Sequence, residues 1–225
     1  MTTLTPATDL DSLSTRLREA TRPEHEHAET RGFVTDLMSG ALGRDAYVDL
    51  ATQHHAIYSA LEDVESAMAG DAVGATFVFG ELARVASLEA DLAVLRGPDW
   101  RTDVRLLPST QEYGARIRSA GSAWSGHYLA HAYTRYLGDL SGGQIVRRML
   151  ERHYGLADDE LTFYAFPSIA KPKVFKDGYR ARIDAAPYSP AEGAEIVAEV
   201  RRAFAFNSAL FTQLGEVHHA AARPA

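Results

Sequence analysis

Four polar residues near the start of the chain could form one ligand-binding stripe. Arg18, Arg22, His25 and Glu29 follow one another at steps of four, three and four residues. In an α-helix, at about 100° per residue, this spacing places them within a stripe roughly 60° wide. An imidazole with a carboxylate one turn away is how a metal-ligating histidine fixes its tautomer and ring orientation. From spacing alone, a solvated helix face with a His–Glu contact is the favoured interpretation, and the ligand-binding stripe stays open beside it.

A second unusual segment is the glycine-rich stretch AHAYTRYLGDLSGGQ at residues 130–144. Gly138, Gly142 and Gly143 interrupt an otherwise good helical sequence, and each costs about 1 kcal/mol relative to alanine. A helix face without side chains lets the backbone approach a flat or bulky ligand closely, and glycine also permits a kink. The alternative is a helix that ends at a turn formed by the last two glycines.

The two segments together suggest a planar ligand held between two helices. Arg135 and Asp139 flank the first glycine, and a plain helix break does not explain why they stand there. His25 could supply an axial ligand from one side, while the glycine-lined wall and Asp139 face the other side. Heme with one proximal histidine and a distal pocket fits this arrangement.

The positioning elements are predicted to be helices throughout. Apolar or buried-type residues recur at steps of three and four, as in Tyr47, Leu50, His54, Ile57 and Leu61. No segment shows the alternation typical of a strand, so the predicted fold class is all-α. The expected helices cover residues 11–29, 30–39, 43–69, 79–96, 109–119, 122–153, 172–185 and 190–214.

Two of these helix starts carry capping-box spacing. Ser109 is followed three residues later by Glu112, and Ser189 by Glu192. Pro190 would stand at the first helical position, where the missing N–H does no harm. We therefore expect one helix to begin at each serine.

Length and composition set limits on the kind of protein. The 225 residues are 46% hydrophobic and 24% charged, which is typical of one globular domain. We expect a flexible arm at 1–10, a domain at 11–215 and a flexible tail at 216–225. No apolar run approaches the roughly 18 residues of a membrane span, and no leader is visible, so we expect a cytoplasmic protein without a membrane partner.

Charge and cysteine content exclude several functions. The chain has no cysteine, which rules out disulfides, thiolate zinc sites, iron–sulfur clusters and a cysteine nucleophile. It also disfavours a thiaminase-like enzyme, whose nucleophile is a cysteine. A net charge of −7 argues against a nucleic-acid partner, because neutralising phosphates needs a concentrated basic face.

Both polar segments resemble signatures of one known family. Residues 19–29, EATRPEHEHAE, resemble the proximal-helix signature of heme oxygenases, and residues 131–144, HAYTRYLGDLSGGQ, resemble the distal-helix signature almost letter for letter. The similarity extends over about residues 10–215. The chain is thus similar to the soluble, bacterial-type heme oxygenases. The resemblance implies a single-domain, multi-helix fold in which heme is sandwiched between a proximal helix and a kinked distal helix.

The resemblance also implies a reaction and its partners. Heme, serving as both substrate and cofactor, would be cleaved by O2 and reducing equivalents to biliverdin, expected as the α isomer, with CO and ferrous iron. A soluble donor, either ferredoxin with its reductase or an NAD(P)H-dependent reductase, would supply the electrons. A monomer is the simplest expectation for the oligomeric state.

Roles for individual residues follow from the same resemblance. His25 would be the axial iron ligand, with Glu29 as its hydrogen-bonding partner. Gly138 and Gly142 would let the distal helix lie on the heme face. Asp139 would hold an ordered water beside the bound oxygen.

Further residues match family positions around this centre. Tyr58, Arg135 and Asn207 would support the same water network. Cations and a phenol at the pocket edge would hold the heme propionates, although each cationic pair taken alone also fits a solvated basic stripe. These edge residues are Arg18, Arg22, Tyr133, Lys176 and Arg180.

Two alternatives remain in view. A heme storage or delivery protein on the same fold would need His25 and the edge cations, but neither Asp139 nor the glycines, so the intact distal set favours an enzyme. His127 and His131 are four residues apart and could share a metal, but two ligands are too few. We expect a structural or surface role for that pair.

Overall fold

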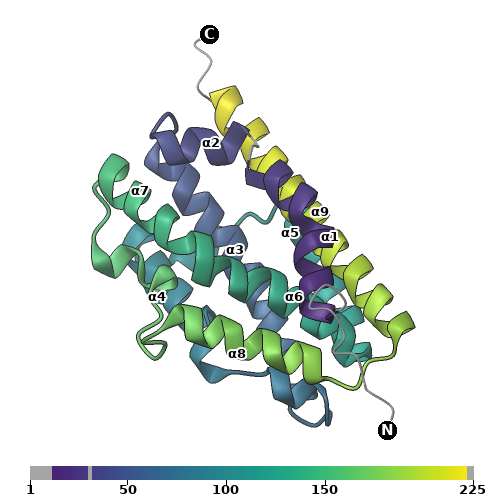
Figure 1. Ribbon diagram of the computed structural model, residues 1–225. Helices are drawn as coiled ribbons and strands as arrows, with labels where there is room; N and C mark the ends of the chain where they lie inside the picture. The colour runs from purple at the N-terminus through teal and green to yellow at the C-terminus, as the bar shows by residue number, and fades with distance from the viewer. Residues whose placement is uncertain (1–11, 30–31, 222–225) are drawn as a thin grey trace, which may run out of the picture.

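The computed structural model describes residues 12–29 and 32–221, without the side chains of residues 21, 23–29, 220 and 221. These ranges hold helices joined by short loops and contain no strand, so the all-α prediction is confirmed (Figure 1). The α-helices are α1 (Leu13–Glu29), α2 (Gly32–Ser39), α3 (Arg44–Met68), α4 (Val85–Arg96), α5 (Pro108–Arg116), α6 (Ser125–Gly138), α7 (Gln144–Tyr154), α8 (Pro172–Ala185) and α9 (Pro190–Ala221).

A π-helical turn joins two of these helices at the glycine-rich segment. The turn covers Asp139–Gly143 and connects α6 directly to α7, so that the three parts run on from one another across the middle of the molecule (Figure 1). A π turn widens the helix locally and is a common cause of a kink near functional sites. The expected helix over 122–153 is therefore present, and its glycines widen it rather than end it.

Helix α9 is the common support of α1 and α6. α1 lies along α9 and also contacts α8, and α6 packs on α9 as well (Figure 1). α3 packs against α4, α5 and α6, and α2 bridges α7 and α9. The long helix α9 thus links the N-terminal helix to the central helix pair.

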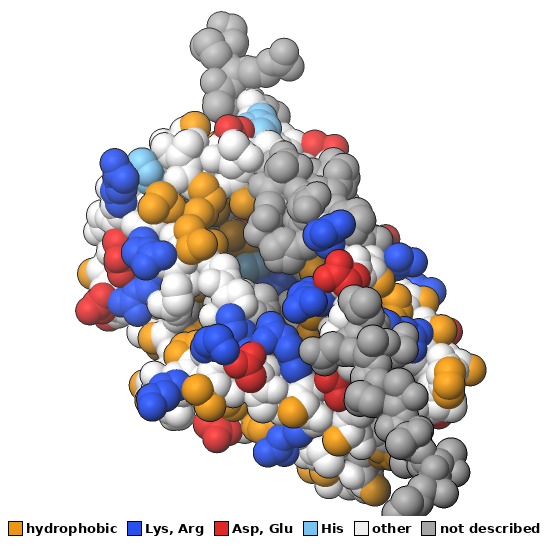
Figure 2. Space-filling model, viewed as in Figure 1, with side chains coloured by type: hydrophobic (Ala, Val, Ile, Leu, Met, Phe, Trp, Pro, Cys, Tyr) orange, Lys and Arg blue, Asp and Glu red, His pale blue; other side chains and the backbone are white. Residues whose placement is uncertain are grey.

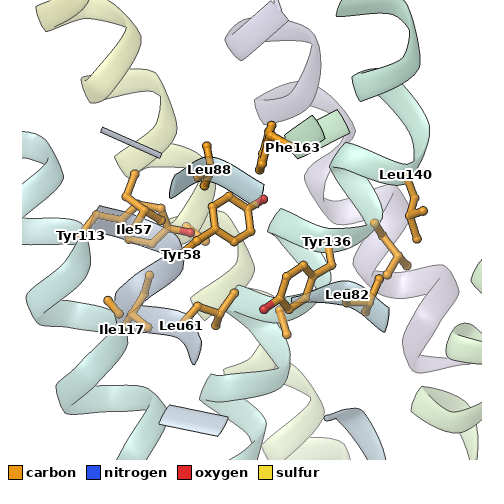
Figure 3. Close-up of a cluster of buried hydrophobic side chains, with 14 of the residues drawn as sticks. Ile57, Tyr58, Leu61, Leu82, Leu88, Tyr113, Ile117, Tyr136, Leu140 and Phe163 are labelled. Carbon is orange, nitrogen blue, oxygen red and sulfur yellow. The ribbon is translucent and has the colours of Figure 1, made fainter. Parts of the chain in front are cut away.

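Helix α3 supplies much of the core. Its residues Tyr47, Ile57, Tyr58 and Leu61 are all almost fully buried, as the predicted periodicity requires. Figure 3 shows Tyr58 surrounded by other labelled aromatic and aliphatic side chains, and its ring centroid lies 5.3 Å from that of Phe163. The core therefore holds rigidly the helix that carries Tyr58.

One predicted helix begins later than expected. The helix expected from residue 79 starts at Val85, after a 3-10 turn at Gly80–Leu82. The backbone N–H groups of Arg84 and Val85 donate to Glu62 Oε1 of α3, at 2.5 and 2.9 Å. A carboxylate from another helix thus caps α4, and a local pattern cannot show such a partner.

The two expected capping boxes have different outcomes. Ser189 and Glu192 form one, because Ser189 N–H donates to Glu192 Oε2 at 2.7 Å and Glu192 N–H donates to Ser189 Oγ at 3.3 Å. The box between Ser109 and Glu112 is wrong. Both the N–H and the hydroxyl of Ser109 donate instead to Gln213 Oε1 of α9, at 3.1 and 2.7 Å. A tertiary contact has replaced the local one.

The C-terminal helix is longer than the sequence pattern indicates. The first part of the expected tail 216–225 continues α9 as far as Ala221. His218 Nε2 lies 3.0 Å from Asp49 Oδ2 of α3, a contact that fixes this end of the helix. The rest of the tail and the expected arm 1–10 lie outside the described residues, and the domain limits stay predictions. No helix among the described residues has the length and apolar character needed to cross a membrane.

A half-buried carboxylate links α3 to α6. Glu65 Oε1 accepts hydrogen bonds from Tyr136 Oη at 2.9 Å and from Tyr128 Oη at 3.2 Å. Burial, together with the neighbouring Glu62 carboxylate, raises the pKa of Glu65 from 4.5 to about 7, although the two tyrosines oppose the shift. The folded protein therefore favours the protonated form of this side chain.

This shift makes the stability of the protein depend on pH. Between pH 4.5 and about 7 the folded state holds a proton that the unfolded state has lost, so the free energy of unfolding falls as pH rises through this window. We expect Glu65→Gln to be more stable than the parent at about pH 8, by on the order of 2 kcal/mol, and close to it at about pH 5. Urea unfolding at both pH values measures this.

The exposed carboxylate Glu112 provides the control, since Glu112→Gln should leave the pH dependence unchanged. A Glu65→Gln variant with the parent's pH dependence would show that Glu65 is ionised in the folded protein.

Candidate functional site

The helix backbone is bare at two positions that face open space. A Cβ atom built on Gly138 or Gly142 would meet no described atom within 4 Å. Neither glycine has a positive φ, so the backbone conformation does not demand glycine at either position. Gly143 differs, because a Cβ there would lie 3.0 Å from Tyr164 Cδ1. Close packing explains the third glycine, whereas the first two leave room for something outside the protein.

Two hollows meet at this bare backbone. The larger, of about 470 Å³, is lined from α1, α6, the π turn, α8 and α9. The second, of about 420 Å³, is lined from α2, α3, α6, the π turn, α7 and α9. Gly138 and Ser141 line both. Figure 2 shows a hollow near the middle of this face, with hydrophobic side chains on one side of it and Lys and Arg side chains on the other. Each volume lies in the range of small-molecule sites.

A polar cluster lies beside the second hollow. Tyr58 Oη donates a hydrogen bond to Asp139 Oδ2. The guanidinium carbon of Arg135 lies 4.8 Å from the centre of the Tyr58 ring, and Arg135 Nη1 donates to Asn207 Oδ1 at 2.7 Å. The structure thus brings together four of the expected site residues, which come from α3, α6, the π turn and α9.

Burial sets the protonation states in this cluster. It raises the pKa of Asp139, against the opposing effects of Arg135 and the Tyr58 hydrogen bond. It also raises the pKa of Tyr58 well above its ordinary value, so that the phenol stays protonated and donates. Burial alone would lower the pKa of Arg135, but the neighbouring Tyr58 and Asp139 outweigh this effect and raise it. The cluster therefore combines a fixed cation, a fixed donor and a carboxyl group that takes up a proton more readily than an exposed one.

Arg135 also has hydrogen-bond donors that no described residue accepts from. Its Nε and Nη2 atoms are buried and have no hydrogen-bond partner among the described residues. A buried charged donor without a partner costs more than the roughly 1–3 kcal/mol of a neutral one. Since Arg135 lines the second hollow, a ligand or water bound there is the candidate partner for these atoms.

Three arginines surround the larger hollow. Arg18 and Arg22 of α1 are exposed and lie 3.3 and 3.9 Å from the carboxylate of Glu19. Arg180 of α8 lies 3.1 Å from Asp177, and its buried Nε has no partner among the described residues. Guanidinium groups can hold carboxylates with two parallel hydrogen bonds. The expected edge residue Tyr133 lines the same hollow.

Lys176 is placed differently from the other expected edge residues. It is not among the residues that line either hollow, and its Nζ donates to Ser141 Oγ at 2.8 Å. The amine therefore ties α8 to the π turn in this structure. A carboxylate ligand would have to compete with Ser141 for it.

His25 and Glu29 lie in the last turns of α1, and their side chains are outside the described part of the chain. The same helix lines the larger hollow through Arg18, Glu19 and Arg22. The structure thus brings the helix to the hollow, and the roles expected for His25 and Glu29 stay predictions.

One residue of the second hollow was not predicted as a site residue, because the sequence pattern placed it only among the buried positions of a helix. His54 of α3 is 7% exposed, and its Nε2 has no hydrogen-bond partner among the described residues. Burial, aided by the Arg135 charge, lowers the pKa of His54 well below its ordinary value, so the ring is neutral. An imidazole within an otherwise apolar helical series was the signal that could have identified it.

A second histidine–carboxylate group lies where α6 packs on α9. His131 Nε2 is 3.1 Å from Glu199 Oε1, and Arg116 Nη2 is 2.6 Å from Glu199 Oε2. Arg202 also donates to Glu199. His127 Nε2 lies 3.2 Å from Glu195 Oε1 in the same region. The structural or surface role expected for the histidine pair stays a prediction.

Comparison with known proteins connects this site to one family. The family model for heme oxygenase matches residues 11–213. Heme oxygenase 1 of Synechocystis is 36% identical over 203 residues, covering 90% of this chain and 85% of that protein. Human heme oxygenase 1 is 35% identical over 208 residues, covering 91% of this chain and 72% of the human protein.

Solved structures agree in fold. The crystal structure of heme oxygenase-1 from Synechocystis in complex with heme matches with a TM-score of 0.87 at 35% identity, covering 90% of this chain and 92% of that one. Heme oxygenase from Leptospira interrogans matches with a TM-score of 0.85 at 33% identity, covering 90% and 99%.

The different surroundings of neighbouring glycines allow a direct test of the hollow. In the purified protein without ligand, Gly143→Ala should lower the free energy of unfolding by about 1–3 kcal/mol, because the methyl group presses on Tyr164. Gly142→Ala should leave it unchanged or raise it by up to about 1 kcal/mol, since the methyl group enters open space and alanine favours a helix. Urea unfolding of both variants measures this. Equal losses in the two variants would mean that the backbone at Gly142 is packed and not open.

Proposed function

The chain belongs to the heme oxygenase family and is therefore a heme-degrading oxidoreductase. We propose that it binds heme as its substrate. With O2 and electrons, it converts the heme to biliverdin, CO and ferrous iron. The observation that carries this proposal is the bare backbone at Gly138 and Gly142 beside the cluster of Tyr58, Arg135 and Asp139. The Synechocystis relative of the same fold was solved with heme bound.

The residues of the site fit a heme. A flat macrocycle needs a wall free of side chains. Gly138, which lines both hollows, and Gly142, which lines the second, provide such a wall. Its apolar faces and edges need apolar neighbours, such as Leu37 and Phe211 in the second hollow and Phe204 in the larger. Its two carboxylates need cations, which the arginines of the larger hollow supply.

We assign the iron ligand to His25. This residue follows Arg18 by seven positions in α1, close to two full helical turns, so the two share a helical register. Glu29 follows His25 by one turn and is the expected partner of the second ring nitrogen. The approach of α1 to the larger hollow supports this assignment.

The arginines would select which edge of the heme is oxidised. Arg18, Arg22 and Arg180 line one hollow, and Asp139 lines the other, so propionates held by the arginines would direct the opposite part of the ring toward the distal cluster. Paired N–H bonds to a carboxylate restrict rotation of the macrocycle in its plane. A fixed rotation favours a single product, and we propose the α isomer.

The distal cluster would control protons. The iron of bound heme activates O2, and the protein must supply protons on the open side of the ring. The raised pKa of Asp139 lets this carboxyl group hold a proton or bind water, while Tyr58 donates to it and holds it in place. Asn207 fixes one end of Arg135 and leaves its other donors for water. The chain has no cysteine, so no thiolate ligand is available to promote O–O cleavage.

The reaction also requires reducing equivalents from outside the chain. Ferredoxin with its reductase and an NAD(P)H-dependent reductase are the proposed classes of donor. A monomeric state and a cytoplasmic location are part of the same proposal.

Product analysis tests the proposal. We expect the purified protein to bind hemin and, with O2 and an electron donor, to lose the heme absorption band while releasing CO and biliverdin, identified as the α isomer by chromatography. An intact heme spectrum after prolonged incubation would instead indicate a storage or delivery protein. A mixture of isomers would refute only the proposed role of the arginines in orienting the ring.

The carboxyl group of Asp139 should matter for turnover and not for binding. We expect Asp139→Asn to lower the rate of biliverdin formation by about 100-fold or more, the size of effect typical for a proton-transferring group, with little change in hemin affinity. Single-turnover absorption and hemin titration measure the two quantities. The exposed Asp159→Asn serves as the control. A full rate in Asp139→Asn would remove Asp139 from the mechanism.

A further inference from the structure

A neutral imidazole lies in the second hollow, and none of the roles assigned so far uses it. His54 lines this hollow together with Arg135 and Asp139. It precedes Tyr58 by one turn of α3, and the two ring centroids are 6.3 Å apart. Most other side chains lining the hollow are apolar, among them Leu37 and Leu50. A polar side chain thus stands in the wall of the hollow beside the distal cluster.

The buried Nε2 atom of His54 needs a hydrogen-bond partner. Among the described residues no atom bonds to it, and leaving a buried polar atom unpaired costs about 1–3 kcal/mol. The hollow of about 420 Å³ has ample room for water, which needs two to four polar partners to be bound in such a site. Arg135 Nε and Nη2, also unpartnered among the described atoms, supply further partners in the same hollow.

The hydrogen-bonding capacities of these groups are complementary. Arg135 can only donate, so a water bound to it must accept there and keep both of its own protons free. A carboxyl oxygen of Asp139 accepts one of these protons. A neutral imidazole with its proton on Nδ1 accepts the other at Nε2. Three groups of the hollow can therefore fix the orientation of one water.

We propose that His54 is a positioning residue of the distal site, whose bare Nε2 accepts a hydrogen bond from water in the second hollow and so orients that water between Arg135 and Asp139. The lowered pKa of His54 agrees with a neutral ring, because the adjacent arginine and the lack of solvent both oppose its charge. The effect on turnover rests on the proposed function, whereas the tautomer and the bound water do not.

Burial for packing alone would have a different consequence. If His54 only filled space, leucine would fill it as well, and the loss of an unpaired nitrogen would make His54→Leu neutral or stabilising without any effect on chemistry. Our proposal makes the same prediction for stability, because His54→Leu folds with at least the parent's stability. The two hypotheses differ in the bound water, whose orientation is lost in His54→Leu under our proposal. In His54→Gln most of that orientation is kept, because the amide oxygen can accept a hydrogen bond.

The first test uses the heme-free protein labelled with ¹⁵N-histidine. We expect nuclear magnetic resonance at about neutral pH to show His54 as the neutral tautomer with a bare Nε2 and with a contact between its ring and bound water. The His54→Leu spectrum assigns the signal. A proton on Nε2, a charged ring, or the lack of a water contact would overturn the proposal.

The second test measures turnover of the heme-loaded variants. We expect His54→Leu to lower kcat roughly tenfold, about the value of one lost hydrogen bond, with hemin affinity unchanged and with His54→Gln close to the parent. His55→Leu is the matched control, because His55 is the next residue of α3 but contacts Glu89 and Trp100 instead of the hollow. An unchanged kcat in His54→Leu would overturn the proposal. A parent protein that degrades no heme would instead refute the proposed function, and the resonance experiment would still decide the water-binding role.

Discussion

The absence of side chains at two positions of a widened helix is the constraint on which the rest of the site depends. Gly138 and Gly142 adopt ordinary helical backbone angles, yet no described atom fills the space where their side chains would be. The walls of such an unfilled space lose dispersion contacts that a bound ligand would restore. The π turn between α6 and α7 widens the helix at this point, and its first residue, Asp139, lines the second hollow beside Gly138 and Gly142.

The electrostatics of the site follow from the burial that the same packing creates. Tyr58, Arg135 and Asn207 come from three helices of the core, and each is less than a tenth exposed. At low dielectric their hydrogen bonds are stronger and their unpaired atoms more costly than at the surface. This is why one carboxyl group, Asp139, is drawn toward neutrality while the arginine beside it keeps its charge. The arginines of the larger hollow remain closer to solvent, where they suit binding of carboxylates rather than proton transfer.

The sequence predicted what depends on local periodicity and missed what depends on distant partners. Steps of three and four residues located every α-helix, because burial of one face repeats with the helical turn. They could not show that Glu62 caps α4 from another helix, or that Gln213 takes the hydrogen bonds of Ser109. The local pattern of the glycine-rich segment favoured a helix end over a kink, whereas the structure continues the helix through a π turn. His54 was overlooked because periodicity reports that a residue is buried, and not what its polar atom faces.

The central claim is that a flat iron porphyrin occupies the space beside the bare backbone, with α1 on its other side. A crystal structure of the hemin complex tests it most directly. We predict that the porphyrin plane lies in van der Waals contact with the backbone of Gly138 and Gly142, with the iron bound by His25 from the opposite face. A macrocycle bound elsewhere, or side chains closing over that backbone while hemin is held by another residue, would contradict the account.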